Sequence, residues 1–192
     1  MNCGPTSPPW KPAAVLEIHL DESDMTLARY VSRQWIREAH TNGYAHRYLH
    51  PNDPDQTWRT TLLGVTGEVA LSKHLGVVYG YRGYDRAAYD VEGCEVRTTL
   101  REAGSLITHP GDKHAPYVLA IAVPGTKYDW TVRLIGWAWL DDCNQPHHWR
   151  TDVRWPCYMT PQSALQPMAT LPHTNTPQEA AQWDSTLTIT NQ

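Results

Sequence analysis

The chain has 192 residues, of which 41% are hydrophobic and 19% are charged, a composition typical of one globular domain with a substantial core. Its formal net charge of −4 argues against a protein that coats nucleic acid through bulk positive charge, but not against an enzyme with a local basic rim and a bound metal. The four cysteines form no CxxC pair and no apolar run is long enough for a membrane span, which argues against a structural zinc site, a disulfide framework and membrane insertion. The first residues show no signal-peptide pattern, so we expect a cytoplasmic location.

The first expected elements are a flexible arm, an edge strand and a helix. Residues 1–13 are rich in proline and small polar residues, which predicts a flexible arm. The short apolar alternation Val15–Leu20 predicts an edge strand. Asp24 has the character of an N-cap for a helix that continues to about Ala39, and Asn42-Gly43 supplies its stop signal.

A second expected helix carries the first candidate site residue. Asp53-Pro54 supplies an N-cap and a proline at the first helical position, and Gly76 ends the helix after Leu75. At about 100° per residue, the apolar residues of this helix fall into two neighbouring groups on one side. Glu68 lies between the two groups, so it is the one charge directed into the core-facing sector. The apolar positions are Trp58, Leu62, Val65, Val69, Leu71 and Leu75.

The rest of the chain predicts strands, a short helix and a tail. A strand is expected over residues 77–81, and a hairpin over 87–91 and 94–99. The nearly continuous apolar run Tyr117–Val123 is typical of a strand buried on both faces. The order of elements predicts an α/β (α+β) fold with a mixed sheet flanked by helices, in one domain over residues 14–171. The remaining expected segments are a strand over 131–140, a short helix over 161–171 interrupted by Pro167, and a flexible tail over 172–192.

Asp90 and Glu95 are the most informative pair in the sequence. With Glu92-Gly93 as the turn of the hairpin, the two flanking residues pair with each other, and Asp90 and Glu95 then face each other across the ladder. Side chains alternate along a strand, so Asp90, Glu95 and Arg97 share one face. Directly opposed like charges destabilise a hairpin, and a divalent cation between them would reverse the sign of that interaction.

Three acids form a candidate metal site: Glu68 from the helix, and Asp90 and Glu95 from the hairpin. Carboxylate oxygens are the ligands that Mg²⁺ prefers, and the Val96 carbonyl can add one more between the functional side chains. Mg²⁺ or Mn²⁺ held there would polarise a phosphate or supply a bound hydroxide. Arg97 would place a fixed positive charge beside the acids and stabilise charge that builds on the phosphoryl oxygens.

These residues resemble the motifs of the PD-(D/E)XK nuclease superfamily, with small bacteriophage-type members as the best comparison. The matching positions are Glu68 in Gly67-Glu68-Val69-Ala70, Asp90 in Tyr89-Asp90-Val91, and the run Glu95-Val96-Arg97. The resemblance covers roughly residues 54–140. It implies a single restriction-endonuclease-like αβββαβ core, magnesium-dependent phosphodiester hydrolysis, and catalytic roles for the matched acids and Arg97. It also implies a prokaryotic cell or a phage-infected host as the setting.

The sequence departs from the family's pattern at the lysine. Arg97 stands in its place, and because a guanidinium effectively cannot lose a proton, Arg97 can stabilise charge but cannot act as a general base. Lys113, in the loop over residues 110–114, is a residue that could supply an amine from elsewhere. Tyr89 replaces the proline that the family often has before the aspartate.

Basic and aromatic residues are interleaved around the acids. Arg82, Arg86, Arg101 and Lys113 are the candidate nucleic-acid-binding residues, because cations contact phosphates and the neighbouring tyrosines can stack on bases. A mixed-charge surface without such a role is the alternative interpretation. A second basic and aromatic patch consists of Trp149, Arg150, Arg154 and Trp155.

The sequence therefore predicts divalent-metal-dependent hydrolysis of nucleic acid, with DNA as the expected substrate and no membrane partner. Two alternatives stay open. A nuclease-like fold without catalysis could bind nucleic acid or a protein partner, and the arginine at position 97 is the feature that favours this hypothesis. The chain could also be a viral structural or assembly protein.

Overall fold

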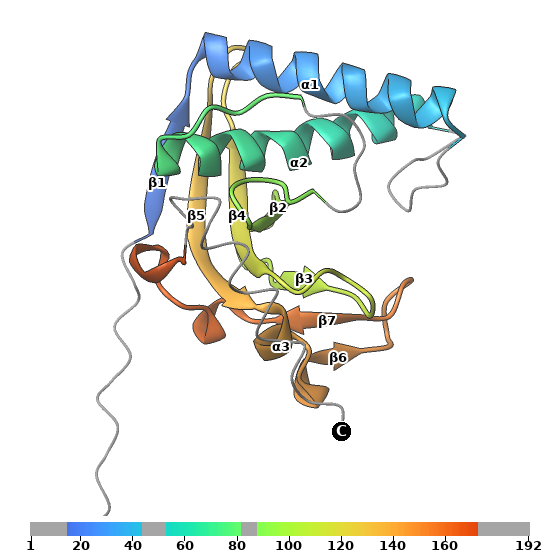
Figure 1. Ribbon diagram of the computed structural model, residues 1–192, viewed down its shortest axis with the longest axis vertical. Helices are drawn as coiled ribbons and strands as arrows, with labels where there is room; N and C mark the ends of the chain where they lie inside the picture. The colour runs from blue at the N-terminus through green and yellow to red at the C-terminus, as the bar shows by residue number, and fades with distance from the viewer. Residues whose placement is uncertain (1–14, 44–52, 82–87, 173–192) are drawn as a thin grey trace, which may run out of the picture.

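The computed structural model of the protein describes residues 15–43, 53–81 and 88–172 (Figure 1). These residues form a mixed α and β fold with two sheets, as the order of elements predicted in general terms. The arm expected over residues 1–13 and nearly all of the tail expected over 172–192 lie outside the described residues. No helix in the described part of the chain combines the length and the apolar character needed to cross a lipid bilayer.

The larger sheet has four strands in the order β1-β5-β4-β2. Strand β2 pairs with β4 in parallel, whereas β4 with β5 and β5 with β1 are antiparallel, so the predicted mixed sheet is confirmed. The predicted edge position of β1 is also confirmed. Residues 116–122 of β4 are all buried, as their continuous apolar run indicated. The strands are β1 (Leu16–Leu20), β2 (Glu95–Thr99), β4 (Pro116–Pro124) and β5 (Trp130–Trp139).

Helix α1 (Glu22–Thr41) begins three residues earlier than the N-cap prediction allowed. The N-cap is Asp21, whose Oδ1 accepts hydrogen bonds from the backbone N–H groups of Ser23 and Asp24 at 2.9 and 3.1 Å. Asp24 is the third helical residue, and its carboxylate accepts a hydrogen bond from the Asp21 N–H at 3.1 Å. The predicted cap was wrong because two aspartates share a reciprocal capping box, and the first of them has the extended backbone that a cap requires.

Helix α2 (Pro54–Leu75) has the predicted bounds and caps. The Asp53 side chain accepts a hydrogen bond from the Gln56 N–H, and Gly76 ends the helix with a φ of 68°, which favours glycine. Helix α2 packs against all four strands of the larger sheet, and α1 packs on α2 (Figure 1). The main hydrophobic core lies between this helical layer and the sheet, and it includes the predicted positions Leu62, Val65 and Val69.

A second sheet of three short strands was not predicted. Its order is β3-β7-β6, and all of its pairings are antiparallel. In Figure 1 it lies below the larger sheet, and a separate apolar cluster that contains Leu106, Tyr117 and Leu140 packs between their elements. The bounds are β3 (Leu106–Thr108), α3 (Leu140–Cys143), β6 (Trp149–Arg150) and β7 (Cys157–Thr160).

Two segments differ from their predicted secondary structure. Residues 77–81 form no strand, and Tyr79 instead places its hydroxyl against Glu68 of α2. Residues 161–171 contain two short 3₁₀ turns, Gln162–Ala164 and Met168–Thr170, in place of a helix. The backbone of Gln166 pairs with that of Trp137 through hydrogen bonds of 3.0 and 2.7 Å, and Pro167 has no N–H to donate, so a continuous helix cannot form there.

The order αβββαβ expected from the resemblance is not confirmed. After α2, the only α-helix in residues 88–172 is the four-residue α3, and it follows β5 directly. The segment before the predicted turn also forms no full strand. Within the described residues, its pairing is limited to an isolated bridge between Val91 and Cys94.

Candidate functional site

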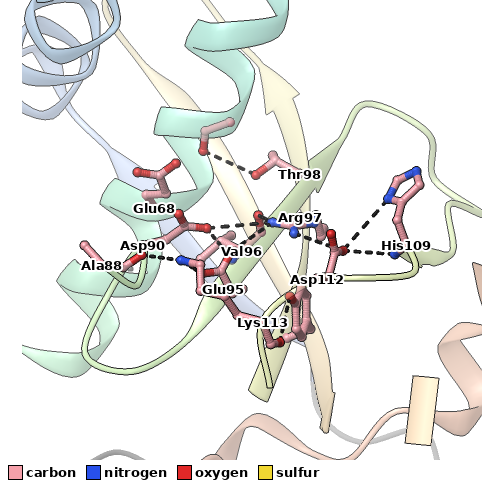
Figure 2. A network of polar contacts seen from close by, with 12 residues as sticks. Glu68, Ala88, Asp90, Glu95, Val96, Arg97, Thr98, His109, Asp112 and Lys113 are labelled. Atoms are coloured by element: carbon pink, nitrogen blue, oxygen red, sulfur yellow. Dashed lines mark hydrogen bonds and ion pairs between the residues drawn. The ribbon is translucent and has the colours of Figure 1, made fainter. Parts of the chain in front are cut away.

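The structure brings three carboxyl side chains together from separate parts of the chain (Figure 2). Glu68 comes from the middle of α2, Asp90 precedes the turn, and Glu95 is the first residue of β2. Electrostatic repulsion by both Asp90 and Glu95 contributes to the raised pKa of Glu68. The three acids expected to act together therefore lie in one network.

A close approach between α2 and β2 positions Glu68. A Cβ atom added at Gly67 would lie 2.0 Å from Oγ1 of Thr98, closer than real Cβ atoms approach, and 3.2 Å from its Cβ, which is tighter than most Cβ contacts. Only glycine at this position lets the helix contact the strand so closely. Glu68, the next residue, is therefore held beside the beginning of β2 by the absence of a side chain at its neighbour.

The turn before β2 forms as predicted. Glu92 and Gly93 have φ angles of 41° and 79°, the left-handed conformation of a two-residue hairpin turn. The two flanking residues, Val91 and Cys94, exchange backbone hydrogen bonds of 3.1 and 2.8 Å. Within the described residues the pairing ends at this bridge. The prediction that Asp90 faces Glu95 across a ladder was therefore wrong.

Asp90 instead turns its carboxylate onto the backbone of the strand. Its Oδ2 accepts a hydrogen bond from the Val96 N–H at 2.9 Å. The same oxygen lies 3.9 Å from Nη1 of Arg97. These contacts with Val96 and Arg97 keep the Asp90 carboxylate near that of Glu95. The prediction had instead placed the two acids together through strand pairing.

Two cations neutralise Glu95, which is only 5% exposed. Its Oε1 accepts a hydrogen bond from Nζ of Lys113 at 2.7 Å, and its Oε2 lies 3.4 Å from Nη1 of Arg97. Lys113 also donates to the carbonyl of Ala88, and its Nζ lies 5.3 Å from the centre of the Tyr89 ring. Each oxygen of this buried carboxylate thus has a cationic partner.

The turn between β3 and β4 holds Arg97 from its other side. Asp112 places Oδ2 3.5 Å from Nη2 of Arg97, and the same oxygen accepts a hydrogen bond from the His109 N–H at 2.9 Å. The guanidinium carbon of Arg97 also lies 4.8 Å from the centre of the Tyr117 ring. Arg97 is thus fixed by acids and an aromatic face, and its Nη1 donates to the Val96 carbonyl at 3.2 Å.

The pKa values of Glu68 and Asp90 are both raised. Burial is the main cause for Glu68, followed by repulsion from Asp90, and together they raise its pKa to about 8 although the Tyr79 hydroxyl donates to its Oε2 at 2.5 Å. Burial and then repulsion from Glu95 raise the pKa of Asp90 to about 6, against the opposing effects of the Val96 N–H and the two cations. A carboxyl with a pKa of about 8 is mostly protonated at neutral pH, so burial and the neighbouring acids favour the neutral form of Glu68.

The site as it stands is not a ready-made metal cage. Within residues 15–43, 53–81 and 88–172, no three His, Cys, Asp or Glu side chains are arranged so that they could hold a metal ion together. The contacts give the physical reason, since Lys113 and Arg97 engage the oxygens of Glu95 and Tyr79 engages Glu68. The donor set nevertheless suits a hard divalent cation, because it consists of three carboxylates that repel one another and a backbone carbonyl.

Among the other predicted nucleic-acid contacts, the one that lies within the described residues is away from the acid network. Arg101 is exposed in the turn that follows β2, at the opposite end of the strand from Glu95. Arg82 and Arg86 lie outside the described residues. Of the two predicted residues that the structure describes, Arg101 and Lys113, it places Lys113 in the acid network.

Sequence reasoning did not identify Tyr79, Asp112 and Tyr117 as part of the network. Tyr79 follows α2 by only a few residues, but its segment resembled a strand. Asp112 lies in the same Gly-Asp turn as Lys113, and this neighbouring position is the feature of the sequence that could have indicated Asp112 as part of the network. The pairing of β2 with β4 sets Glu95 opposite Tyr117 and Arg97 opposite Leu119, and this parallel register depends on contacts that the local sequence does not contain.

Comparison of the chain with models of protein families, with curated proteins and with solved structures found no match.

Proposed function

We propose that this protein is a divalent-metal-dependent nuclease that hydrolyses phosphodiester bonds, with DNA as its substrate. The observation that carries the proposal is the acid cluster of Glu68, Asp90 and Glu95, in which burial and mutual repulsion raise the pKa of Glu68 to about 8 and that of Asp90 to about 6. Perturbed carboxyls that converge with fixed cations are typical of functional sites. The resemblance of these positions to PD-(D/E)XK motifs supports the same function and a related core.

Mg²⁺ or Mn²⁺ would be held by the carboxylates of Glu68, Asp90 and Glu95, with the Val96 carbonyl as a further ligand. When bound, such an ion would supply Lewis-acid activation of a phosphate and of water. The oxygen-only donor set fits an ion of this type, and a bound cation would favour the ionised forms of Glu68 and Asp90, whose pKa values are raised.

Arg97 would act as a fixed positive charge for the phosphate. Its guanidinium stays protonated, and Glu95, Asp112 and the Tyr117 ring hold its position. A donor that is already in place where charge develops costs no rearrangement during the reaction. Arg97 would therefore bind and stabilise phosphoryl oxygens, and it would take no part in moving protons.

Lys113 would supply the amine that position 97 lacks. Its Nζ is 2.7 Å from Oε1 of Glu95, on a turn remote in sequence from that residue. Unlike a guanidinium, an amine of this kind can give up and take back a proton. In this proposal Arg97 supplies the positive charge and Lys113 transfers the proton. A single lysine can combine these two roles.

Binding of nucleic acid without cleavage is the second candidate function. Two observations favour it: arginine stands in place of the family's lysine, and both oxygens of Glu95 are paired with cations. In this case the acids would hold Arg97 and Lys113 in position, and those two residues would contact phosphate.

Cleavage assays separate these two functions. Linear and circular DNA, single-stranded DNA and RNA are incubated with Mg²⁺, with Mn²⁺ or with a chelator, and the products are separated on gels. We expect metal-dependent cleavage by the wild type and a loss of at least about 100-fold for Glu95→Gln, since the change removes a charge at the reacting site. Glu17→Gln on β1, an exposed carboxylate changed in the same way, is the control and should be fully active.

The absence of metal-dependent cleavage on every substrate would contradict the nuclease proposal. Calorimetric titration with Mn²⁺ then tests what remains. If the wild type binds Mn²⁺ and the Asp90→Asn variant does not, the proposed metal site is supported although the protein is inactive. No Mn²⁺ binding together with affinity for nucleic acid would favour the second candidate.

A further inference from the structure

The hairpin of β6 and β7 ends in an exposed tip, residues 151–156, that has no role in the acid network. All six of its residues are exposed. Trp155 is 61% exposed, more than any other Trp or Tyr side chain in the described residues. The guanidinium carbon of Arg154 lies 5.6 Å from the centre of the Trp155 ring. The tip thus presents a large apolar ring and a cation side by side to solvent.

Side-chain contacts connect the two strands at the base of the hairpin. The rings of Trp149 and Tyr158 lie 4.7 Å apart, on residues that are paired across the two strands. Arg150 forms two hydrogen bonds with the Asp152 carboxylate, of 2.9 and 2.7 Å. The charge of Arg150 is therefore balanced, whereas Arg154 has no carboxylate partner in the described part of the chain. Arg154 is the cation that the tip has available for a ligand.

The register of the second sheet places this tip at the same end as part of the candidate site. In the antiparallel pairing of β3 with β7, Thr108 lies opposite Tyr158. The chain that leaves β3 enters the turn with Asp112 and Lys113, and the chain that enters β7 comes from the tip. Both segments extend from one end of the sheet, as Figure 1 shows. The tip and the turn that carries Lys113 therefore lie toward the same end of the second sheet.

An exposed indole beside an arginine matches the chemistry of unpaired nucleotides. Every base has a face that stacks on an aromatic ring, and a neighbouring arginine contacts the phosphate. Bases inside a duplex are already stacked on one another, so a flat aromatic platform favours bases that are free. An acidic or purely apolar partner would use only one of the two groups.

We propose that the tip of residues 151–156 binds unpaired nucleotides of a nucleic-acid strand, with Trp155 stacking on a base and Arg154 contacting a phosphate. This inference rests on the proposed function, because it takes nucleic acid to be the ligand of the acid network. It adds that the substrate is single-stranded, or has a single-stranded segment, where it passes the tip.

Fluorescence anisotropy of a labelled oligonucleotide tests the proposal. The probes are a mixed-sequence single strand of roughly 20 nucleotides, longer than typical single-strand sites, and the blunt duplex of the same sequence. A chelator is present, so no cleavage occurs. We expect Trp155→Ala to bind the single strand about tenfold more weakly, and Trp155→Phe to retain most of the affinity. Duplex affinity should change by less than about twofold, because its bases offer no free face.

Tyr128→Ala is the matched control. Tyr128 is also an exposed aromatic residue of a turn, 47% exposed, with Nζ of Lys127 4.7 Å from the centre of its ring. Its turn joins β4 to β5 at the opposite end of β4 from Tyr117 and the acid network. The Tyr128→Ala variant should bind both probes as the wild type does.

Arg154→Gln gives an independent measurement that does not depend on the tryptophan variant. Loss of one phosphate contact should reduce the slope of log affinity against log salt by about 0.7 for the single strand. Near-ultraviolet circular dichroism checks that each variant is folded, and if Trp155→Ala is not, Trp155→Phe and Arg154→Gln decide. An unchanged slope with wild-type affinity in Arg154→Gln would then overturn the proposal.

The outcomes also separate this proposal from the proposed function. Weak binding by Trp155→Ala, in a protein that cleaves nothing, supports the tip and contradicts the nuclease. If the protein cleaves nucleic acid but its single-strand affinity does not depend on Trp155, the nuclease proposal is supported and the tip proposal is contradicted. Wild-type protein that does not bind the single strand, or a Trp155→Ala variant that loses duplex affinity equally, overturns the tip as a site for unpaired nucleotides.

Discussion

Two clusters of acids and cations in this protein have similar composition, but the pKa values of their aspartates shift in opposite directions. At the beginning of α1, Asp21 and Asp24 lie near Lys73, at 3.9 and 2.5 Å from its Nζ. At the beginning of β2, Asp90 and Glu95 lie near Arg97 and Lys113. Hydrogen bonds from Ser23 and the helix backbone lower the pKa of Asp21, whereas burial raises the pKa of Asp90. Burial, and not the residue types, makes the second cluster a candidate for chemistry.

The exposed cluster already has an adequate physical role. It caps α1, and Lys73 connects α2 to that cap and to the His19 carbonyl. In the buried cluster, burial and repulsion from Asp90 raise the pKa of Glu68 to about 8, which no capping or structural role explains. Variants that affect one cluster and not the other therefore test whether this difference has functional meaning.

The largest expected effect is on cleavage by a variant of Lys113. Lys113→Ala should reduce the cleavage rate by about 10²- to 10⁴-fold if its amine transfers a proton, and the pH dependence of the remaining rate should change. Lys73→Ala removes an ammonium from the exposed cluster and should leave the rate unchanged. Equal activity of the two variants would place proton transfer elsewhere.

The second effect is on stability as a function of pH without divalent metal. Unfolded carboxyls titrate near pH 4. Because Asp90 and Glu68 have pKa values raised to about 6 and about 8, the folded state binds more protons, and stability falls as pH rises from about 4 to 8. The fall should be on the order of a few kcal/mol, and Glu68→Gln should reduce it. Urea unfolding at a series of pH values measures both.

The exposed cluster should respond in the opposite direction. The lowered pKa of Asp21 stabilises the folded state above the pKa of the unfolded chain, and this stabilisation is lost as pH falls. Asp21→Asn should therefore weaken the pH dependence only in acid. If Glu68→Gln changes stability in acid alone, the contrast between the clusters is wrong.

The third effect concerns the helix contact that positions Glu68. Gly67→Ala should destabilise the protein by about 1–3 kcal/mol, because its Cβ would overlap with Thr98. Gly64→Ala, on the same helix, meets no atom within 4 Å and should be neutral or stabilise by up to about 1 kcal/mol. Thr98→Gly should restore part of the loss in the Gly67→Ala background. Urea unfolding of the wild type and these three variants gives the comparison.

The smallest effect is expected for Arg97→Lys. The variant keeps a positive charge between Glu95 and Asp112 but loses the planar fork, so cleavage should stay within about tenfold of the wild type. The measurement is the initial cleavage rate at saturating metal. An increase of more than about 100-fold would assign proton transfer to position 97 and not to Lys113.

The parts of this fold that local chemistry determines were predictable from the sequence. Caps and apolar periodicity gave α2 with its bounds, the apolar run gave β4, and Glu92-Gly93 gave the turn. Glu68 could be identified as a candidate site residue because its helix position is core-facing. These predictions rely on neighbours within a few turns of helix or a few residues of strand.

The remainder depends on contacts that are distant along the chain. Strand β6 has two residues and β3 has three, too few to show a period, and their sheet exists because β7 pairs with both. Lys113 reaches Glu95 because β2 and β4 run in parallel, which brings the turn before β4 to the beginning of β2. Residue type suggested Lys113 as an amine donor, but only the tertiary structure gives its partner.

The hydrogen bond from the Val96 N–H to Asp90 has a consequence for solubility. Strand β2 is at the edge of its sheet, where unpaired backbone groups can recruit a strand from another molecule. The Asp90 carboxylate occupies the Val96 N–H and adds a charge at that edge, so it discourages intermolecular strand pairing. An acid proposed for catalysis thus also protects the protein from aggregation, and Asp90→Asn, which keeps an acceptor oxygen, should remain more soluble than Asp90→Ala.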